Sequence, residues 1–154
     1  MSAVQLDEID VRILRLLQED ASGSINQIAE RINLSANACW RRIKRLDDDG
    51  LIRKRVALVN AAKLGWGIVV FASVKVFEHS EQWLEEFSDA VDAISEVQEL
   101  YRLSGETDYL LKVRVRDIEH YDRVYKRLIK TIKIREMSSS FAMEEMKSTT
   151  AVPL

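Results

Sequence analysis

Cysteine, proline, glycine and histidine are scarce in this sequence of 154 residues, which contains one, one, five and two of them. A single cysteine excludes an internal disulfide and suits a reducing compartment. Few glycines and one proline argue against a loop-rich fold. The longest apolar run, residues 67–73, is far too short to cross a bilayer, and the acidic first ten residues are not typical of a signal peptide. We therefore expect a cytoplasmic protein without membrane contact.

Residues that commonly build catalytic and metal sites are also few. His79 and His120 lie far apart in the sequence, and neither stands in a ligand-spaced motif. Three successive carboxylates at residues 47–49 diverge around a helix instead of converging on an ion. Cys39 lies on an apolar helix face, where a thiol behaves as a small hydrophobe. With no phosphate-binding loop or nucleophile elbow present, we expect no metal, no cofactor and no enzymatic activity.

What the sequence does contain is clear helical periodicity in its first third. Residues 6–18 form an apolar stripe behind an acidic first turn, which predicts a first helix. A second, short helical pattern follows, with Ile25, Ile28, Ala29 and Ile32 at helical spacing. Ser35 is a favourable N-cap for a third helix. Two short helices so closely joined fit a helix-turn-helix unit, whose second helix enters the major groove of DNA.

The third helix has two different faces. Cys39, Ile43 and Leu46 share one face at i, i+4 and i+7. The opposite face carries Asn37, Arg41 and Lys44. The alternative is an ordinary helical domain in which Arg41, Arg42, Lys44 and Arg45 form a solvated surface.

Basic charge is concentrated around this helix, although the whole chain has a net charge of −2. Residues 41–55 contain seven basic and three acidic side chains. Residues 51–60 are rich in β-branched and apolar side chains, which predicts a strand that forms half of a small wing. Arg53, Lys54 and Arg55 in this stretch either contact phosphates or protect a solvated strand edge.

A glycine-containing link at residues 60–67 predicts a boundary between domains at 1–64 and 65–154. The second part has the pattern of a ferredoxin-like βαββαβ domain, so the fold class is α+β. The predicted strands are residues 68–77, 97–103, 109–115 and 134–146, and the predicted helices are residues 81–94 and 118–130. Apolar residues on both faces of the first of these strands predict that the open face of the sheet is a partner surface.

Several motifs together resemble the Lrp/AsnC family of transcriptional regulators. They are LDEID at 6–10, ILRLLQED at 13–20, LS at 34–35, RRIKRL at 41–46, GLI at 50–52, SGETDYLL at 104–111, Lys147 and the final Pro153-Leu154. The likeness covers nearly the whole chain. It implies a winged helix-turn-helix joined to a βαββαβ effector domain, homodimers that assemble to octamers, and a free amino acid bound between dimers.

The resemblance also implies particular residues. Contacts to double-stranded DNA would come from Ser35, Asn37, Ala38, Trp40, Arg41, Arg42, Lys44, Arg45, Arg53 and Arg55. The effector pocket would include Gly105, Thr107, Asp108, Tyr109, Ser138 and Ser139. Asp108 would pair with the α-ammonium group, although Gly105 and Asp108 also suit a purely structural turn.

Two stretches bear on the identity of the effector. Residues 38–40 and 139–144 look like those of a cysteine-responsive branch, which points to a sulfur amino acid such as cysteine. Residues 130–134 lack the glycine that family members usually have and are shortened, which bears on the ligand set. Two other functions stay open: an enzyme on the ferredoxin-like domain, and a small-molecule-binding oligomer that would leave the basic stretch 41–55 unexplained.

Overall fold

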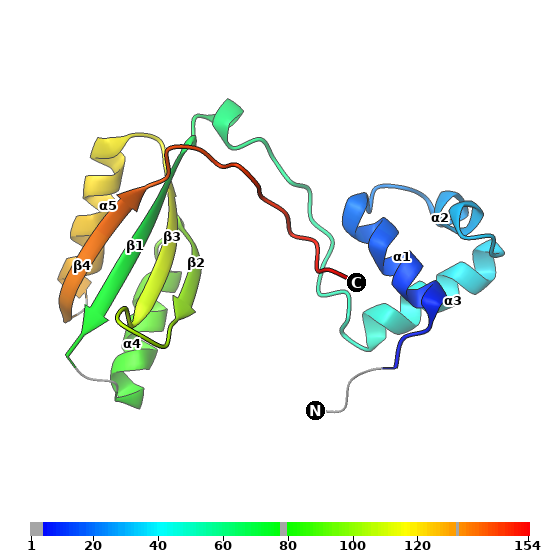
Figure 1. Ribbon diagram of the computed structural model, residues 1–154, viewed down its shortest axis with the longest axis horizontal. Coiled ribbons are helices and arrows are strands. Elements are labelled where there is room, and N and C mark those ends of the chain that lie inside the picture. The colour runs from blue at the N-terminus through cyan, green and yellow to red at the C-terminus, as the bar shows by residue number, and fades with distance from the viewer. Residues whose placement is uncertain (1–4, 78–79, 132) are drawn as a thin grey trace. The chain divides into compact units, whose positions relative to one another are not determined.

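A computed structural model describes residues 5–77, 80–131 and 133–154 of the chain (Figure 1). Contacts within the chain divide it into two compact units. The N-terminal unit comprises Met1–Leu58 together with Lys147–Leu154, and the C-terminal unit comprises Val59–Met146. The predicted boundary after residue 64 therefore differs from the observed division, and the last eight residues return to the N-terminal unit.

Three helices form the N-terminal unit: α1 (Glu8–Glu19), α2 (Ile25–Arg31) and α3 (Ala36–Asp48). Each begins at a side chain that accepts a hydrogen bond from a first-turn amide, namely Asp7, Ser24 and Ser35. Helix α3 ends before Gly50, whose positive φ of 71° is readily adopted by glycine. The three predicted helices are confirmed, with shifts of one or two residues at their ends.

A small apolar core holds these helices together. Its buried residues are Ile13, Leu14, Ile28, Ala29, Ile32, Cys39, Ile43 and Leu46. Burial raises the pKa of the Cys39 thiol, so this side chain is a neutral part of the core.

The strand predicted for residues 51–60 is wrong for the described chain. This stretch has no regular secondary structure, and it is followed by a short 3-10 helix, η1 (Ala62–Leu64). A strand needs a neighbouring strand to satisfy its backbone groups, and the chain provides none here. The apolar side chains of Val56 and Leu58 are therefore 60% and 76% exposed.

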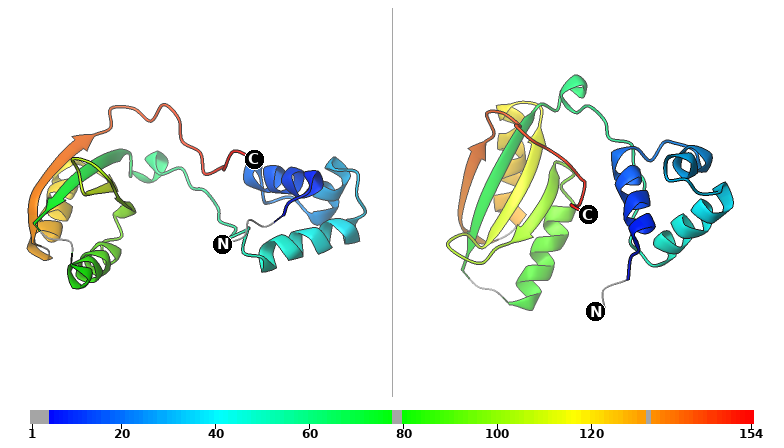
Figure 2. Two further views of the ribbon diagram at one scale, coloured as in Figure 1. Left: turned by 60° about the horizontal axis from the view of Figure 1, so that its bottom comes forward. Right: turned by 45° about the vertical axis from the view of Figure 1, so that its right-hand side comes forward.

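The C-terminal unit is an antiparallel sheet covered on one face by two helices (Figure 1, Figure 2). Its elements are β1 (Ile68–Val76), α4 (Glu81–Asp92), β2 (Val97–Arg102), β3 (Tyr109–Val115), α5 (Ile118–Thr131) and β4 (Ile134–Phe141). The strand order is β2-β3-β1-β4. The ferredoxin-like βαββαβ order is confirmed, but β4 ends five residues before the predicted Met146.

Alternation along β1 separates the two faces of the sheet. Val70, Ala72 and Val74 are buried under the helices, next to the aromatic cluster of Trp83, Phe87 and Tyr109. The open face includes Phe71 and Tyr101, which are 38% and 49% exposed. It also carries the Lys112–Glu99 ion pair and the Lys75–Glu136 ion pair. The open face is thus more charged than the sequence pattern of β1 alone predicted.

The tail of the chain docks on α1 within the N-terminal unit. The Gln18 side-chain amide donates to the Val152 carbonyl at 3.2 Å and accepts from the Val152 N–H at 2.6 Å. The Arg15 Nε donates to the Leu154 carbonyl at 3.0 Å. The chain therefore passes between the two units twice, at residues 58–59 and at residues 146–147.

The buried carboxylate of Glu96, the residue just before β2, ties the start of this strand to α5. It accepts from His120 Nε2 at 2.9 Å and from Arg127 at 2.6 Å. The His120 Nδ1 accepts from the Arg116 N–H, which places the proton of the neutral ring on Nε2. Burial by itself raises the pKa of Glu96, but the hydrogen bonds from His120 and Arg127 outweigh it and lower the pKa to about 2.

We predict that Glu96 makes the C-terminal unit acid-sensitive. The folded-state pKa of Glu96 is about 2, below the ordinary 4.5. Its contribution to the free energy of unfolding is therefore complete above pH 4.5 and is lost as the pH falls through about 2. The contribution is about 3 kcal/mol. In urea unfolding followed by tryptophan fluorescence, Glu96→Gln should lower the free energy of unfolding at pH 7 and flatten its dependence between pH 4.5 and 2. The exposed Glu85→Gln on α4 is the control, and equal slopes for wild type and Glu96→Gln would contradict the assignment.

Candidate DNA-binding surface and effector site

Helix α3 presents an exposed polar side opposite the side that builds the core. Asn37, Arg41 and Lys44 are all exposed on this side, as the helical spacing predicted. Lys44 forms an ion pair with Asp48 one turn later, and this hydrogen bond raises the Lys44 pKa. Lys44 therefore remains a cation near neutral pH.

The remaining predicted DNA contacts on α3 differ in exposure. The Ser35 hydroxyl accepts from the Ala38 N–H at 3.3 Å, so Ser35 caps the helix and Ala38 is half-buried beside it. Trp40 is exposed on the flank of the helix. A cleft of about 200 Å³ lies beside Trp40, and Lys44 and Arg55 are among the other residues that line it.

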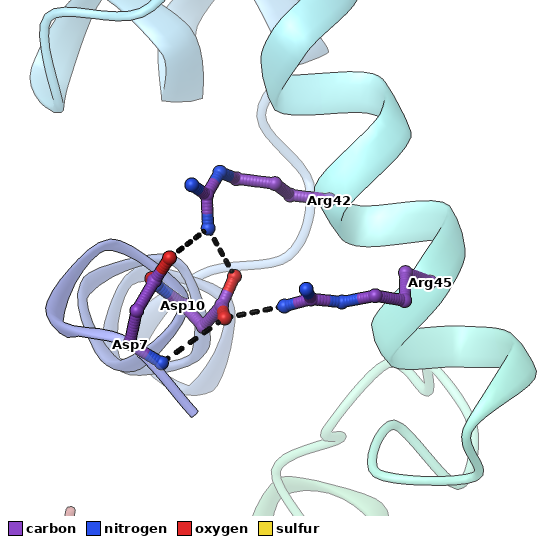
Figure 3. A network of polar contacts seen from close by, with 4 residues as sticks. All are labelled: Asp7, Asp10, Arg42 and Arg45. Atoms are coloured by element: carbon purple, nitrogen blue, oxygen red, sulfur yellow. Dashed lines mark hydrogen bonds and ion pairs between the residues drawn. The ribbon is translucent and has the colours of Figure 1, made fainter. Parts of the chain in front are cut away.

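Arg42 and Arg45 form a separate group, because both reach back to α1 (Figure 3). Arg42 Nη1 lies 2.6 Å from an Asp7 carboxylate oxygen and 2.8 Å from Asp10 Oδ1. Arg45 pairs with the other oxygen of Asp10. Asp10 is 1% exposed, so two arginines of α3 enclose a buried carboxylate of α1. We call Asp7, Asp10, Arg42 and Arg45 the α1–α3 clamp.

The clamp favours the charged forms of Asp7 and Arg42. The Asp10 N–H and the Arg42 guanidinium hold the pKa of Asp7 below its usual range. Hydrogen bonds to Asp7 and Asp10 raise the pKa of Arg42. This partnership was not predicted from the sequence. The local feature that could have indicated it is Asp10, an acidic residue next to the apolar stripe of α1 that begins at Ile9.

The basic residues after α3 lie on the exposed stretch that was predicted to be a wing strand. Arg53, Lys54 and Arg55 are exposed. Arg55 also pairs with Asp47 of α3 at 3.0 Å, which holds residue 55 against this helix.

The turn between β2 and β3 has the geometry that its sequence predicted. Gly105 has a φ of 137°, a conformation that glycine adopts without strain. Asp108 accepts from the Val76 N–H at 2.8 Å, and its own N–H donates to the Val74 carbonyl at 3.1 Å. Asp108 thus fastens the turn to the end of β1, which supports a structural role whether or not the turn also binds a ligand.

The other predicted effector residues do not all face this turn. Tyr109 is buried in the aromatic cluster, and Thr107 is half-buried. Ser138 and Ser139 pair with Ser73 and Ala72 of β1, so they lie on opposite faces of the sheet. Ser139 Oγ lies 2.5 Å from the Tyr121 hydroxyl, on the helix-covered face.

A cavity of about 600 Å³ lies at the end of the sheet where β4 begins. Its lining combines apolar and basic side chains: Phe77, Tyr125, Ile129, Lys130, Lys133, Ile134, Arg135, Glu136 and Met137. Lys75 pairs with both Glu106 of the turn and Glu136 of β4, so the turn and this cavity belong to the same end of the sheet. Ile132, within the shortened segment 130–134, lies outside the described residues.

Two kinds of feature are absent from the described residues. No group of three or more His, Cys, Asp or Glu side chains that could hold a metal ion was found among them, and His79 lies outside this set. Within the same residues, no helix is both long and apolar enough to span a membrane.

Comparison with known proteins places both units in one family. A winged helix-turn-helix DNA-binding family model matches residues 6–53, and a model of the Lrp/AsnC ligand binding domain matches residues 69–152. The glutamate uptake regulatory protein of Zymomonas mobilis is 47% identical over 97% of this chain and 92% of its own length. The DNA-binding transcriptional activator DecR of Escherichia coli is 42% identical over 97% of this chain and 99% of its own.

Solved structures agree with these matches over nearly the full chain. An AsnC family transcriptional regulator from Agrobacterium tumefaciens has a TM-score of 0.94 and 47% identity, covering 96% of this chain and 97% of that one. A transcriptional regulator from Neisseria meningitidis in complex with L-Met has a TM-score of 0.92 and 33% identity, covering 97% of each chain. The chain belongs to the Lrp/AsnC family of DNA-binding transcriptional regulators.

Proposed function

We propose that α3 reads the major groove through Asn37, Arg41 and Lys44. The observation that carries this assignment is their common exposure on the side of α3 opposite its buried residues. Ser35, Ala38 and Trp40 belong to the N-terminal half of α3, which is the half that approaches base edges in a helix-turn-helix. Arg42 and Arg45 are assigned to the α1–α3 clamp instead.

The basic stretch after α3 supplies the phosphate contacts. Arg53 and Arg55 are exposed, and the pair between Arg55 and Asp47 keeps this segment beside α3. Such contacts position a protein on the duplex without reading its sequence.

Substitutions at the two kinds of contact should have different effects on DNA binding. Arg41→Ala should cost about 1–3 kcal/mol on the preferred sequence and relax discrimination between sequences, because a bidentate base contact is lost. Arg53→Ala should weaken binding to all duplexes alike and reduce the salt slope by about one. Fluorescence anisotropy with specific and random duplexes over a range of salt concentrations measures both effects.

The matched control is Arg123→Ala, which removes an exposed arginine from α5 of the C-terminal unit. It should change neither affinity nor salt slope appreciably. If Arg41→Ala and Arg53→Ala bind both duplexes as the wild type does, the surface has been misassigned.

We also propose that the C-terminal unit binds a free amino acid at the turn 104–108. The Neisseria meningitidis regulator, which is 33% identical to this chain, was solved in complex with L-Met. In this chain Gly105, Thr107 and Asp108 form the turn, and Asp108 supplies a carboxylate for the α-ammonium group. Lys75 links the turn to the start of β4, next to the basic cavity.

The proposed effector is a small sulfur amino acid, cysteine in the first place, because residues 38–40 and 139–144 look like those of a cysteine-responsive branch. The positions of Tyr109 and Ser139 on the helix-covered face restrict their part to shaping the site, while Ser138 lies on the other face. The pocket is therefore proposed to centre on Asp108.

Asp108→Asn should separate ligand binding from folding. Asparagine keeps an oxygen that can accept from the Val76 N–H, but it removes the charge that would pair with an ammonium group. Isothermal calorimetry with L-cysteine and L-methionine should show an affinity at least about tenfold lower for Asp108→Asn than for the wild type. Asp89→Asn, at an exposed position on α4, should bind as the wild type does. Equal affinity of wild type and Asp108→Asn would move the pocket elsewhere, and an absence of binding to the wild type would exclude this class of effector.

The working form is proposed to be a cytoplasmic homodimer that assembles to an octamer. Exposed apolar side chains support self-association: Phe71 and Tyr101 lie on the open sheet face, and Val56 and Leu58 lie on the stretch without a strand partner. A concentration-independent monomer in analytical ultracentrifugation would refute this assembly. We assign no catalytic activity to the chain.

A further inference from the structure

We propose that Asp10 is a positioning residue for DNA recognition: its buried carboxylate sets the orientation of α3 through Arg42 and Arg45. This inference rests on the proposed role of α3 as the recognition helix. It assigns to α1 a function in sequence readout although Asp10 is buried away from solvent.

Both oxygens of the Asp10 carboxylate are engaged. Oδ1 accepts from Arg42 Nη1 at 2.8 Å, and Oδ2 accepts from the Asp7 N–H at 3.2 Å and from Arg45. Arg42 also contacts Asp7, whose other oxygen accepts from the Asp10 N–H at 2.8 Å. The first turn of α1 and its capping residue therefore form one rigid acceptor for two donors from α3 (Figure 3).

Apolar packing alone specifies the orientation of α3 weakly. Among the described residues, the core of the N-terminal unit has eight buried side chains, of which Ala29 and Cys39 are small, and seven partly buried apolar side chains packed against them. Contacts between apolar side chains are non-directional, so small rotations of a helix change the buried area little. Charge-assisted hydrogen bonds depend on both distance and angle, and buried ion pairs can contribute specificity of structure more than stability.

The spacing of the two arginines makes the clamp effective. Arg42 and Arg45 are one helical turn apart, so two points along α3 are held to a single carboxylate. Each is preceded in the sequence by a proposed base-contacting residue, Arg41 and Lys44. With side chains extending about 5–6 Å from the helix axis, a rotation of roughly 20° displaces their ends by about 2 Å. That displacement far exceeds the tolerance of a hydrogen bond to a base edge.

The clamp therefore affects specific and non-specific binding differently. Loss of the Asp10 charge leaves the exposed Arg53 and Arg55 in place, so the number of phosphate contacts is unchanged. Misplacement of α3 instead removes contacts to base edges. Asp10→Asn should lower the ratio of specific to non-specific affinity by tenfold or more while leaving the salt slope unchanged.

The first test measures this ratio by fluorescence anisotropy with the full-length protein, using a preferred duplex and a random duplex. Asp20→Asn is the matched control, because it removes an exposed carboxylate just after α1 and has the same effect on net charge. The proposal predicts loss of discrimination for Asp10→Asn alone. A lowered melting temperature with an unchanged affinity ratio would show a merely structural role and would overturn it.

Arg45→Gln keeps the test decisive if Asp10→Asn does not fold, because Arg42 still pairs with Asp10 in this variant. As a clamp member, Arg45→Gln should reduce discrimination with an unchanged salt slope. If Arg45 instead contacts a phosphate directly, binding to both duplexes weakens together and the slope falls by about one, which contradicts the clamp role.

A measurement without DNA separates this inference from the proposed function. Spin labels at Arg12→Cys and Asp48→Cys report the α1–α3 distance, since both positions are exposed and Cys39 is buried. Dilution with unlabelled protein suppresses distances between copies. The distance distribution should broaden or shift in Asp10→Asn and stay unchanged in Asp20→Asn. An unaltered distribution in Asp10→Asn overturns the clamp even if the wild type binds DNA. A wild type that lacks sequence preference overturns the proposed function, while the distances still decide the clamp.

Discussion

The orientation of α3 depends on one buried carboxylate. Asp10 is almost fully removed from solvent, and such a group is costly to bury unless donors surround it. Two arginines from α3 and a backbone amide from the start of α1 provide them. Removal of either arginine would leave the buried Asp10 carboxylate with fewer donors, so the carboxylate and both arginines act as a unit. This arrangement fixes the direction in which the exposed polar side of α3 faces.

The C-terminal unit also contains a buried carboxylate, that of Glu96, which accepts hydrogen bonds from His120 and Arg127. Its sheet also holds the turn 104–108 firmly, because Asp108 bonds to two positions near the end of β1. Two segments of chain connect this unit to the DNA-binding unit, at residues 58–59 and 146–147, and the second ends in the tail that docks on Gln18. The C-terminal unit, most of which matches the Lrp/AsnC ligand binding domain, is thus connected to the helix-turn-helix by two segments of the chain.

Periodicity was sufficient to predict the helices and the βαββαβ order, because these follow from local capping and from the alternation of apolar residues. Helical spacing also predicted the exposure of Asn37, Arg41 and Lys44, because it places them opposite the buried side of α3. The partners of Arg42 and Arg45 lie more than 30 residues away and were not predicted, since no local pattern encodes them. Residues 51–60 have strand propensity but no neighbouring strand within the described chain, so the strand predicted from propensity was wrong. The family resemblance implied that Ser138 and Ser139 both belong to the effector pocket, although neighbouring strand residues face opposite sides of the sheet.

We propose that α3 reads DNA sequence from an orientation fixed within the N-terminal unit. The most direct measurement is selection of duplexes from a random-sequence library by the full-length protein, followed by sequencing of the bound fraction. We expect enrichment of a symmetric motif whose half-sites are separated by about one helical turn of DNA, or a multiple of it. A bound fraction with the same composition as the starting library would contradict it.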